Sequence, residues 1–180
     1  MRSFIAIPVA DDTAKALAAL QRRLAVGRPL PRDNLHLTLA FLDDQSEETL
    51  EALHEELQQI RCAPFALSLA GLGQYGRAVH LVVSDTPALT ALHGSIGRAV
   101  SRAGISLPRR RFRPHVTIIR LKPGTRLRRL REDVAGFRYE DMPVDRFALY
   151  GSTLHPEGAR HDCLADYPLA STARNETGES

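Results

Sequence analysis

Two short segments of the sequence carry the same pattern, His-x-Thr-x, at residues 36–39 (His-Leu-Thr-Leu) and 115–118 (His-Val-Thr-Ile). Side chains alternate between the two faces of a β-strand. The histidine and threonine of each segment therefore share one face, and two aliphatic residues share the other. If the two strands lie side by side, they place two imidazoles and two hydroxyls in one site. Such a site suits acid–base chemistry on a phosphate group.

The residue types fit that chemistry closely. Histidine titrates near neutral pH, so one imidazole, His36 or His115, can donate a proton while the other accepts one. The hydroxyls of Thr38 and Thr117 can donate hydrogen bonds to non-bridging phosphate oxygens and stabilise developing charge. No cluster of His, Asp or Glu surrounds either motif. We therefore expect neither a metal nor a cofactor.

Length and composition are those of an ordinary globular protein. The 180 residues, 43% of them hydrophobic, fit a single domain that buries most of its apolar surface. No segment reaches the roughly 20 apolar residues of a membrane span, and the N-terminus has no signal-peptide pattern. Cys62 and Cys163 are too far apart for a Cys-x-x-Cys site. We expect a cytoplasmic monomer with reduced thiols.

The charge is distributed unevenly. Residues 98–131 hold twelve of the 24 basic residues and no acid, whereas residues 43–56 hold seven acids and no base. The basic run surrounds His115 on both sides. It either keeps an Arg-rich surface solvated or attracts a polyanion toward that histidine.

Alternating and helical hydrophobic patterns predict the elements that position the motifs. The segment Gly71–Gly76 reads as a turn, and the tail from residue 170 to residue 180 has little to bury, which favours disorder. Strands are expected at residues 4–9, 35–42, 65–69, 78–83, 115–121, 144–153 and 161–167, and helices at about 12–24, 47–60, 87–103 and 125–134.

This order of elements predicts an α+β fold. The motifs are 79 residues apart, and each motif strand is followed by a turn and a helix, which indicates a weak internal duplication. We expect residues 1–169 to form one two-lobed, pseudo-symmetric domain with mostly antiparallel sheets and helices on the outer faces. The two motifs would face each other across a central cleft.

At this point the residues resemble a known family. Residues 34–42 (Asn-Leu-His-Leu-Thr-Leu-Ala-Phe-Leu) and 113–120 (Arg-Pro-His-Val-Thr-Ile-Ile-Arg) are similar to the paired signatures of the two-histidine phosphoesterase superfamily. They most resemble those of its RNA 2′,3′-cyclic phosphodiesterases, also called 2′-5′ RNA ligases. The resemblance extends over about residues 2–167. The sequence departs from the family at Asp43, where glycine is usual, and at His80, where tryptophan is frequent.

The resemblance implies metal-independent hydrolysis of RNA 2′,3′-cyclic phosphate ends, tRNA-like fragments among them, to 2′-phosphomonoesters, with weak reverse 2′-5′ ligation. We hypothesise that His36 protonates the departing O3′ and that His115 activates water. Substrate-binding candidates are Phe41 and Arg120, each five residues after a motif histidine, together with Tyr150 and Arg113. On a regular strand Phe41 and Arg120 would point to the core, but a twist or bulge could turn them to the cleft rim. An unpaired guanidinium does not bury, which favours the rim for Arg120.

Other interpretations stay open from the sequence alone. The enzyme could act on a small cyclic nucleotide, such as ADP-ribose 1″,2″-cyclic phosphate, or on 2′-5′ oligoadenylate. A nucleotide- or RNA-binding module without turnover is a further alternative, although it would have no need of an acid–base pair. The five remaining histidines receive structural or surface interpretations: His54, His80, His93, His155 and His161.

Overall fold

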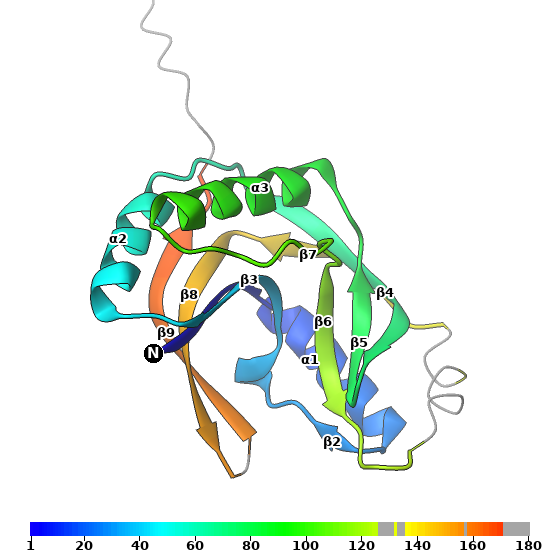
Figure 1. Cartoon of the computed structure of the whole chain (residues 1–180). Helices are drawn as coiled ribbons and strands as arrows, with labels where there is room; N and C mark the ends of the chain where they lie inside the picture. Colours follow the sequence, from blue (N-terminus) through cyan, green and yellow to red (C-terminus); the bar gives the residue numbers. More distant parts are fainter. Residues whose placement is uncertain (126–131, 133–135, 157, 171–180) are drawn as a thin grey trace, which may run out of the picture.

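The computed structural model describes residues 1–125, 132, 136–156 and 158–170. Within these residues it contains one nine-stranded sheet, three α-helices and a short 3-10 helix (Figure 1). The strands are β1 (Arg2–Pro8), β2 (Arg28–Pro29), β3 (His36–Asp44), β4 (Phe65–Tyr75), β5 (Ala78–Val83), β6 (His115–Arg120), β7 (Arg138–Val144), β8 (Arg146–His155) and β9 (Gly158–Pro168). The helices are α1 (Asp11–Leu24), α2 (Glu47–Gln58), α3 (Pro87–Arg102) and η1 (Arg32–Asn34).

Strand order brings the two motif strands together. The sheet runs β7-β4-β5-β6-β3-β1-β8-β9, with β2 paired to β6, and its described pairings are all antiparallel. Strands β3 and β6 are neighbours at its centre, joined at a single register position, Leu37 opposite Val116. The expected α+β class and antiparallel strands are confirmed, and one continuous sheet joins the two halves of the chain.

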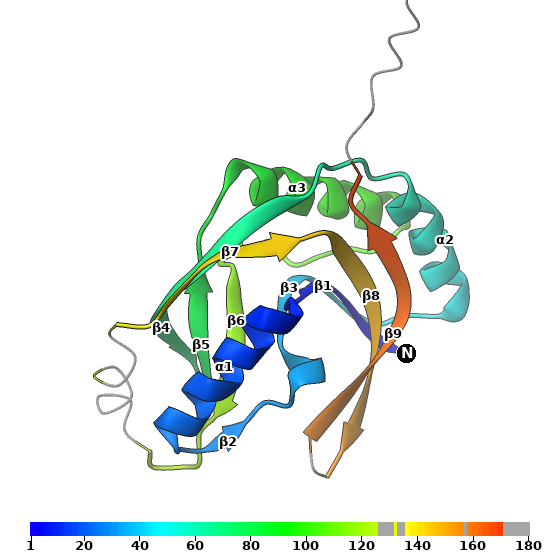
Figure 2. The ribbon, with the colours of Figure 1, turned by 180° about the vertical axis from the view of Figure 1, so that it is seen from behind.

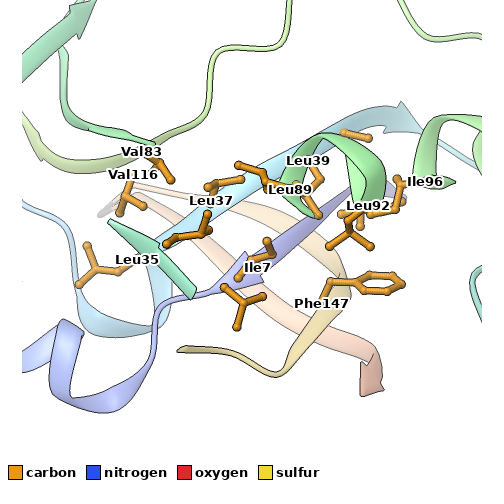
Figure 3. Packing of buried hydrophobic residues seen from close by; sticks show 14 of the residues in the cluster. Ile7, Leu35, Leu37, Leu39, Val83, Leu89, Leu92, Ile96, Val116 and Phe147 are labelled. Atoms are coloured by element: carbon orange, nitrogen blue, oxygen red, sulfur yellow. The ribbon is translucent and has the colours of Figure 1, made fainter. Parts of the chain in front are cut away.

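The aliphatic face of the motif strands forms the core. Leu37, Leu39, Val116 and Ile118 are buried in a cluster to which all three helices contribute, as Figure 3 shows for the α3 side chains. Helices α2 and α3 pack against each other, α3 contacting the central strand β3 and α2 the edge strand β9, and α1 lies on the side seen in Figure 2. Because side chains alternate, burial of these aliphatic residues directs the histidines and threonines to the opposite face.

Some element boundaries differ from the expectation. Strand β4 continues through the predicted turn as far as Tyr75, because residues 72–75 pair with β5 and leave only a two-residue turn at Gly76 and Arg77. Strand β7, which was not predicted, forms the edge beside β4. The predicted basic helix at residues 125–134 and the predicted tail lie largely outside the described residues. In the described part of the chain, no helix is long and apolar enough to cross a membrane.

Candidate active site

The two motifs lie across from each other in a pseudo-twofold arrangement. Leu37 and Val116 are paired on antiparallel strands, so the next position in each direction sets Thr38 against His115 and His36 against Thr117. All four side chains line one cleft, whose volume is about 270 Å³. The structure thus brings together the four residues that the sequence singles out for catalysis.

A matching bulge interrupts each motif strand three residues after the histidine. On β3 the pairing with β1 passes from Thr38 to Ala40 and skips Leu39. On β6 the pairing with β5 passes from Thr117 to Ile119 and skips Ile118. An extra residue on one strand reverses the faces of the residues that follow it. In both motif strands, the side chains therefore switch faces at the same distance from the motif histidine.

The bulges turn two predicted binding residues toward the cleft. Phe41 is 62% exposed, in contrast to the buried Leu42 that follows it, and Arg120 is exposed at the end of β6. Both line the cleft. The rim position considered for them from the sequence is the observed one.

The other two predicted binding residues are placed differently, and neither is among the residues lining the cleft. Tyr150 is half-buried, with its ring stacked on that of Phe4 at a centroid distance of 5.1 Å. Burial raises the pKa of Tyr150 to about 12. Arg113 contributes its backbone instead: Nδ1 of His115 lies 2.7 Å from the Arg113 carbonyl oxygen.

That carbonyl fixes the tautomer of His115. A carbonyl oxygen can only accept a hydrogen bond, so Nδ1 of His115 donates its proton to Arg113 and Nε2 is left to exchange protons. His36 has a comparable hydrogen bond with the backbone of Asn34, again two residues earlier in the chain. Both imidazoles are therefore oriented by the segment that leads into their strand.

His36 lies in surroundings that oppose its protonation. Burial lowers its pKa from 6.5 to about 4, and His161 and His115 add to the shift by charge repulsion, whereas the backbone of Asn34 acts in the opposite direction. Near pH 7 these surroundings favour the neutral imidazole. A phosphate anion beside His36 would oppose the shift and stabilise the protonated form.

Sequence reasoning missed two histidines, to which it gave structural or surface interpretations. His161, on β9, lines the cleft, and its ring lies edge-on to that of His36. His80, on β5, is only 5% exposed, and its ring centroid lies 4.6 Å from that of His115. Each motif histidine thus has a second histidine beside it. Alternation along β5 puts His80 and Leu81 on opposite faces, and this could be predicted from the sequence. The pairing of His161 with Ser152 could not.

His80 fits because the neighbouring strand offers it space. Gly73 lies opposite it on β4, and a Cβ at Gly73 would come within 2.1 Å of Nε2 of His80. Tyr75 stacks on the other side of the His80 ring, at 4.7 Å. Burial, followed by repulsion from His115, lowers the pKa of His80 to about 4. The departure from tryptophan at this position thus gives His115 a mainly neutral imidazole as its neighbour.

Asp43, the other departure from the family pattern, has a backbone φ of 56°. This left-handed region favours glycine, which accounts for glycine as the usual residue at that position. Its carboxylate is part of the cleft rim. Within the described residues, no group of three or more His, Cys, Asp or Glu side chains is placed to hold a metal ion.

Comparisons with known proteins agree with this geometry. Residues 7–155 match the model of the 2′-5′ RNA ligase superfamily. The chain is 32% identical to an RNA 2′,3′-cyclic phosphodiesterase of Thermotoga maritima, over 91% of this chain and 93% of that protein.

Solved structures show the same similarity. The crystal structure of E. coli LigT complexed with 3′-AMP is 28% identical, with a TM-score of 0.73, and covers 94% of this chain and 98% of its own. The crystal structure of TT0787 of Thermus thermophilus is 26% identical, with a TM-score of 0.76, and the match covers 96% of this chain and 100% of that one. The paired motifs, the antiparallel fold and these matches agree, and the chain belongs to the 2′-5′ RNA ligase superfamily.

Proposed function

We propose that this protein hydrolyses the 2′,3′-cyclic phosphate at RNA ends and releases a 2′-phosphomonoester. The observation that carries the proposal is the convergence of both His-x-Thr-x motifs on one cleft. Relatives named as RNA 2′,3′-cyclic phosphodiesterases support the reaction class. The cyclic ester is a single phosphodiester group, so one imidazole can take a proton from the attacking water while the other gives a proton to the departing oxygen.

In the proposed mechanism the two histidines have different roles. Nε2 of His115 accepts a proton from water as the water oxygen bonds to phosphorus. The bond from phosphorus to O3′ breaks, and His36 donates a proton to O3′. The hydrogen bond from His115 Nδ1 to the Arg113 carbonyl supports this, because it leaves Nε2 with a lone pair. The phosphate remains on O2′.

The threonines bind the group that reacts. The hydroxyls of Thr38 and Thr117 donate hydrogen bonds to the non-bridging oxygens, one from each half of the cleft. Such donors act most strongly where charge increases in the transition state. Replacing one comparable donor in other enzymes costs about 10²–10³-fold in rate, so Thr38→Val and Thr117→Val should each fall in that range.

The pKa of His36 indicates when it becomes an acid. Its surroundings lower that pKa to about 4, which favours the neutral form near pH 7. The phosphodiester anion stabilises the imidazolium by direct charge attraction. In the proposed cycle His36 therefore takes up its proton together with the substrate.

The rim binds the terminal nucleotide. Phe41 offers an exposed ring on which a base can stack, and Arg120 offers a guanidinium to a base or phosphate. Tyr150 acts indirectly: its ring stacks on that of Phe4, and the Phe4 ring lies 4.8 Å from that of His36. The side chain of Arg113 is assigned to RNA outside the cleft.

We extend the proposal to the molecule as a whole: residues 1–169 act as one two-lobed domain, monomeric and cytoplasmic, without metal or cofactor. Ends of tRNA-like fragments are proposed substrates. Formation of a 2′-5′ bond, in which an RNA 5′-hydroxyl replaces water as the nucleophile on the cyclic phosphate and O3′ leaves with a proton, is limited by equilibrium. Light scattering of the purified protein tests the monomer.

The decisive experiment incubates the protein and a short RNA ending in a 2′,3′-cyclic phosphate with an excess of chelator. We expect a 2′-phosphate end, identified against 2′- and 3′-phosphate standards, and no loss of rate in chelator. His36→Ala and His115→Ala serve as matched controls. A 3′-phosphate product, or a requirement for metal, would contradict the proposal.

A further inference from the structure

Arg28 and Arg120 are direct neighbours across a strand pair. Strand β2 pairs with the end of β6, and Arg28 lies opposite Arg120 in this register. Both side chains are exposed and both line the cleft. Like charges directly opposite each other on antiparallel strands destabilise the pair. The fold therefore maintains an unfavourable contact at the edge of the active site.

Among the residues that the structure describes, no carboxylate compensates for this contact. In the described part of the chain, neither Arg28 nor Arg120 forms an ion pair or a side-chain hydrogen bond. A third arginine, Arg2, also lines the cleft, and Asp43 is the one acid among the described lining residues. The excess positive charge is thus available to an anionic ligand.

Two glycines hold Arg28 in place. Gly27 has a φ of +65°, and a Cβ there would lie 2.5 Å from the backbone oxygen of Arg120, so β2 can approach β6 only with glycine at this position. Gly158 begins β9, and a Cβ there would lie 2.9 Å from Nη2 of Arg28. The guanidinium therefore lies directly against the backbone of the β8–β9 hairpin, which extends beside β2 (Figure 2).

The hairpin is hydrogen-bonded to η1, the short helix that leads into the first motif strand. Nδ2 of Asn34 donates a hydrogen bond of 2.9 Å to the carbonyl oxygen of Ala159. Arg28 therefore lies between two parts of the cleft wall, one leading to His36 and one carrying His161. Its guanidinium is beside the cleft in which the reacting phosphate is proposed to bind.

We propose that Arg28, together with Arg120, binds a second phosphate: the internucleotide phosphodiester on the 5′ side of the terminal nucleotide. This inference rests on the proposed function. A mononucleoside 2′,3′-cyclic phosphate has only the reacting phosphate, whereas a dinucleotide with the same end has one more. Arginine binds phosphate oxygens through paired N–H groups, so the site distinguishes an RNA end from a free nucleotide.

The test compares two substrates on one variant. Wild-type kcat/KM is measured for adenosine 2′,3′-cyclic phosphate and for the dinucleotide ApA ending in a 2′,3′-cyclic phosphate, and then for Arg28→Gln. We expect the wild type to prefer the dinucleotide. Arg28→Gln should lower that preference about 10- to 100-fold, the range for losing a hydrogen bond to a charged group. Arg28→Lys, which keeps the charge, should retain part of it.

Arg160→Gln is the matched control. Arg160 lies on β9, in the hairpin that Arg28 contacts, and its substitution removes the same charge. Arg160 is not among the lining residues, so the substrate preference should not change. Thermal unfolding of each variant reports on the fold. If Arg28→Gln remains folded and lowers kcat/KM equally for both substrates, the proposed second phosphate site is wrong and the proposed function stands. If the wild type cleaves neither substrate, the proposed function fails and this inference fails with it.

Discussion

The ring of His161 meets the ring of His36 edge-on, with centroids 5.4 Å apart and planes at 82°. This contact joins β9, near the end of the chain, to the first motif strand. A protonated His161 repels a proton on His36, and this repulsion is the second cause, after burial, of the low pKa of His36. The third imidazole of the cleft therefore acts on the charge of the first.

This relationship predicts a pH profile. The proposed scheme needs one proton on the histidine pair, carried by His36, and a free lone pair on His115. A second proton enters the pair only as pH falls toward the His36 pKa of about 4, so the acidic limb of kcat/KM should lie near pH 4. His161→Phe keeps an aromatic ring against His36 but removes the repulsion, which raises the pKa of His36. The acidic limb should therefore move to higher pH. The control is His93→Phe, on α3 and not among the residues lining the cleft, which should leave the acidic limb unchanged. If wild type and His161→Phe have the same acidic limb, His161 does not affect the pKa of His36.

Stability should depend on pH through the same buried groups. His36 and His80 have pKa values lowered to about 4 from 6.5, so between these values the unfolded chain binds protons that the folded chain excludes. The free energy of unfolding should fall as pH is lowered through this window. Urea unfolding at pH 7, 6, 5 and 4 measures it. His80→Phe should show the smaller fall, and parallel curves for the two proteins would falsify the assignment for His80.

The roles of the two motif histidines can be separated with a leaving group that needs no proton. On RNA, His36→Ala and His115→Ala should each lose about 10²–10⁴-fold in rate. On a 4-nitrophenyl phosphodiester, His36→Ala should lose less than about tenfold, because nitrophenolate leaves unprotonated, whereas His115→Ala should remain impaired. If His115→Ala, and not His36→Ala, regains activity on the nitrophenyl substrate, then His115 is the proton donor and His36 the acceptor.

Gly73→Ala tests whether His80 supports His115. The added methyl would come within 2.1 Å of Nε2 of His80, so the His80 ring must move and its contact with His115 must change. We expect a lower kcat although residue 73 is not among those lining the cleft. Gly97→Ala is the control: the methyl would meet open space within α3, and Ala stabilises a helix interior by roughly 0.5–1 kcal/mol relative to Gly. If both variants have the same kcat, the hypothesis that His80 supports His115 is wrong.

Phe41→Ala should separate binding from stability. The side chain is 62% exposed, so the free energy of unfolding should change by no more than about 0.5 kcal/mol. Stacking on a base contributes ~1–3 kcal/mol, so KM for RNA should rise roughly 5- to 150-fold. Leu39→Ala, two residues earlier and buried, should instead destabilise the fold. An unchanged KM would exclude Phe41 from substrate binding.

Local patterns were sufficient for some of this site. Alternation within residues 36–39 and 115–118 predicted that His36 and His115 share a face with Thr38 and Thr117, because period two is a property of any strand. The placement of Phe41 was left between core and rim, because a bulge depends on how the neighbouring strand pairs. Burial of both Leu39 and Ala40 shows where the register shifts.

Long-range pairing explains what the sequence did not reveal. His161 enters the cleft because β9 pairs with β8, and β8 in turn pairs with β1, the neighbour of the first motif strand. Strand β7 joins the sheet through β4, although its sequence alternates only weakly. Such pairings depend on residues far apart in the chain, which no window of neighbouring residues contains.

The single register pair between β3 and β6 has a geometric consequence. Leu37 and Val116 are fully buried, and they are the only point at which the two motif strands are held in register within the described chain. No other register pair joins the two strands among the described residues, and all four motif side chains line the cleft beside this pair. The spacing between His36 and His115 therefore depends on two buried aliphatic side chains that are not themselves among the residues lining the cleft.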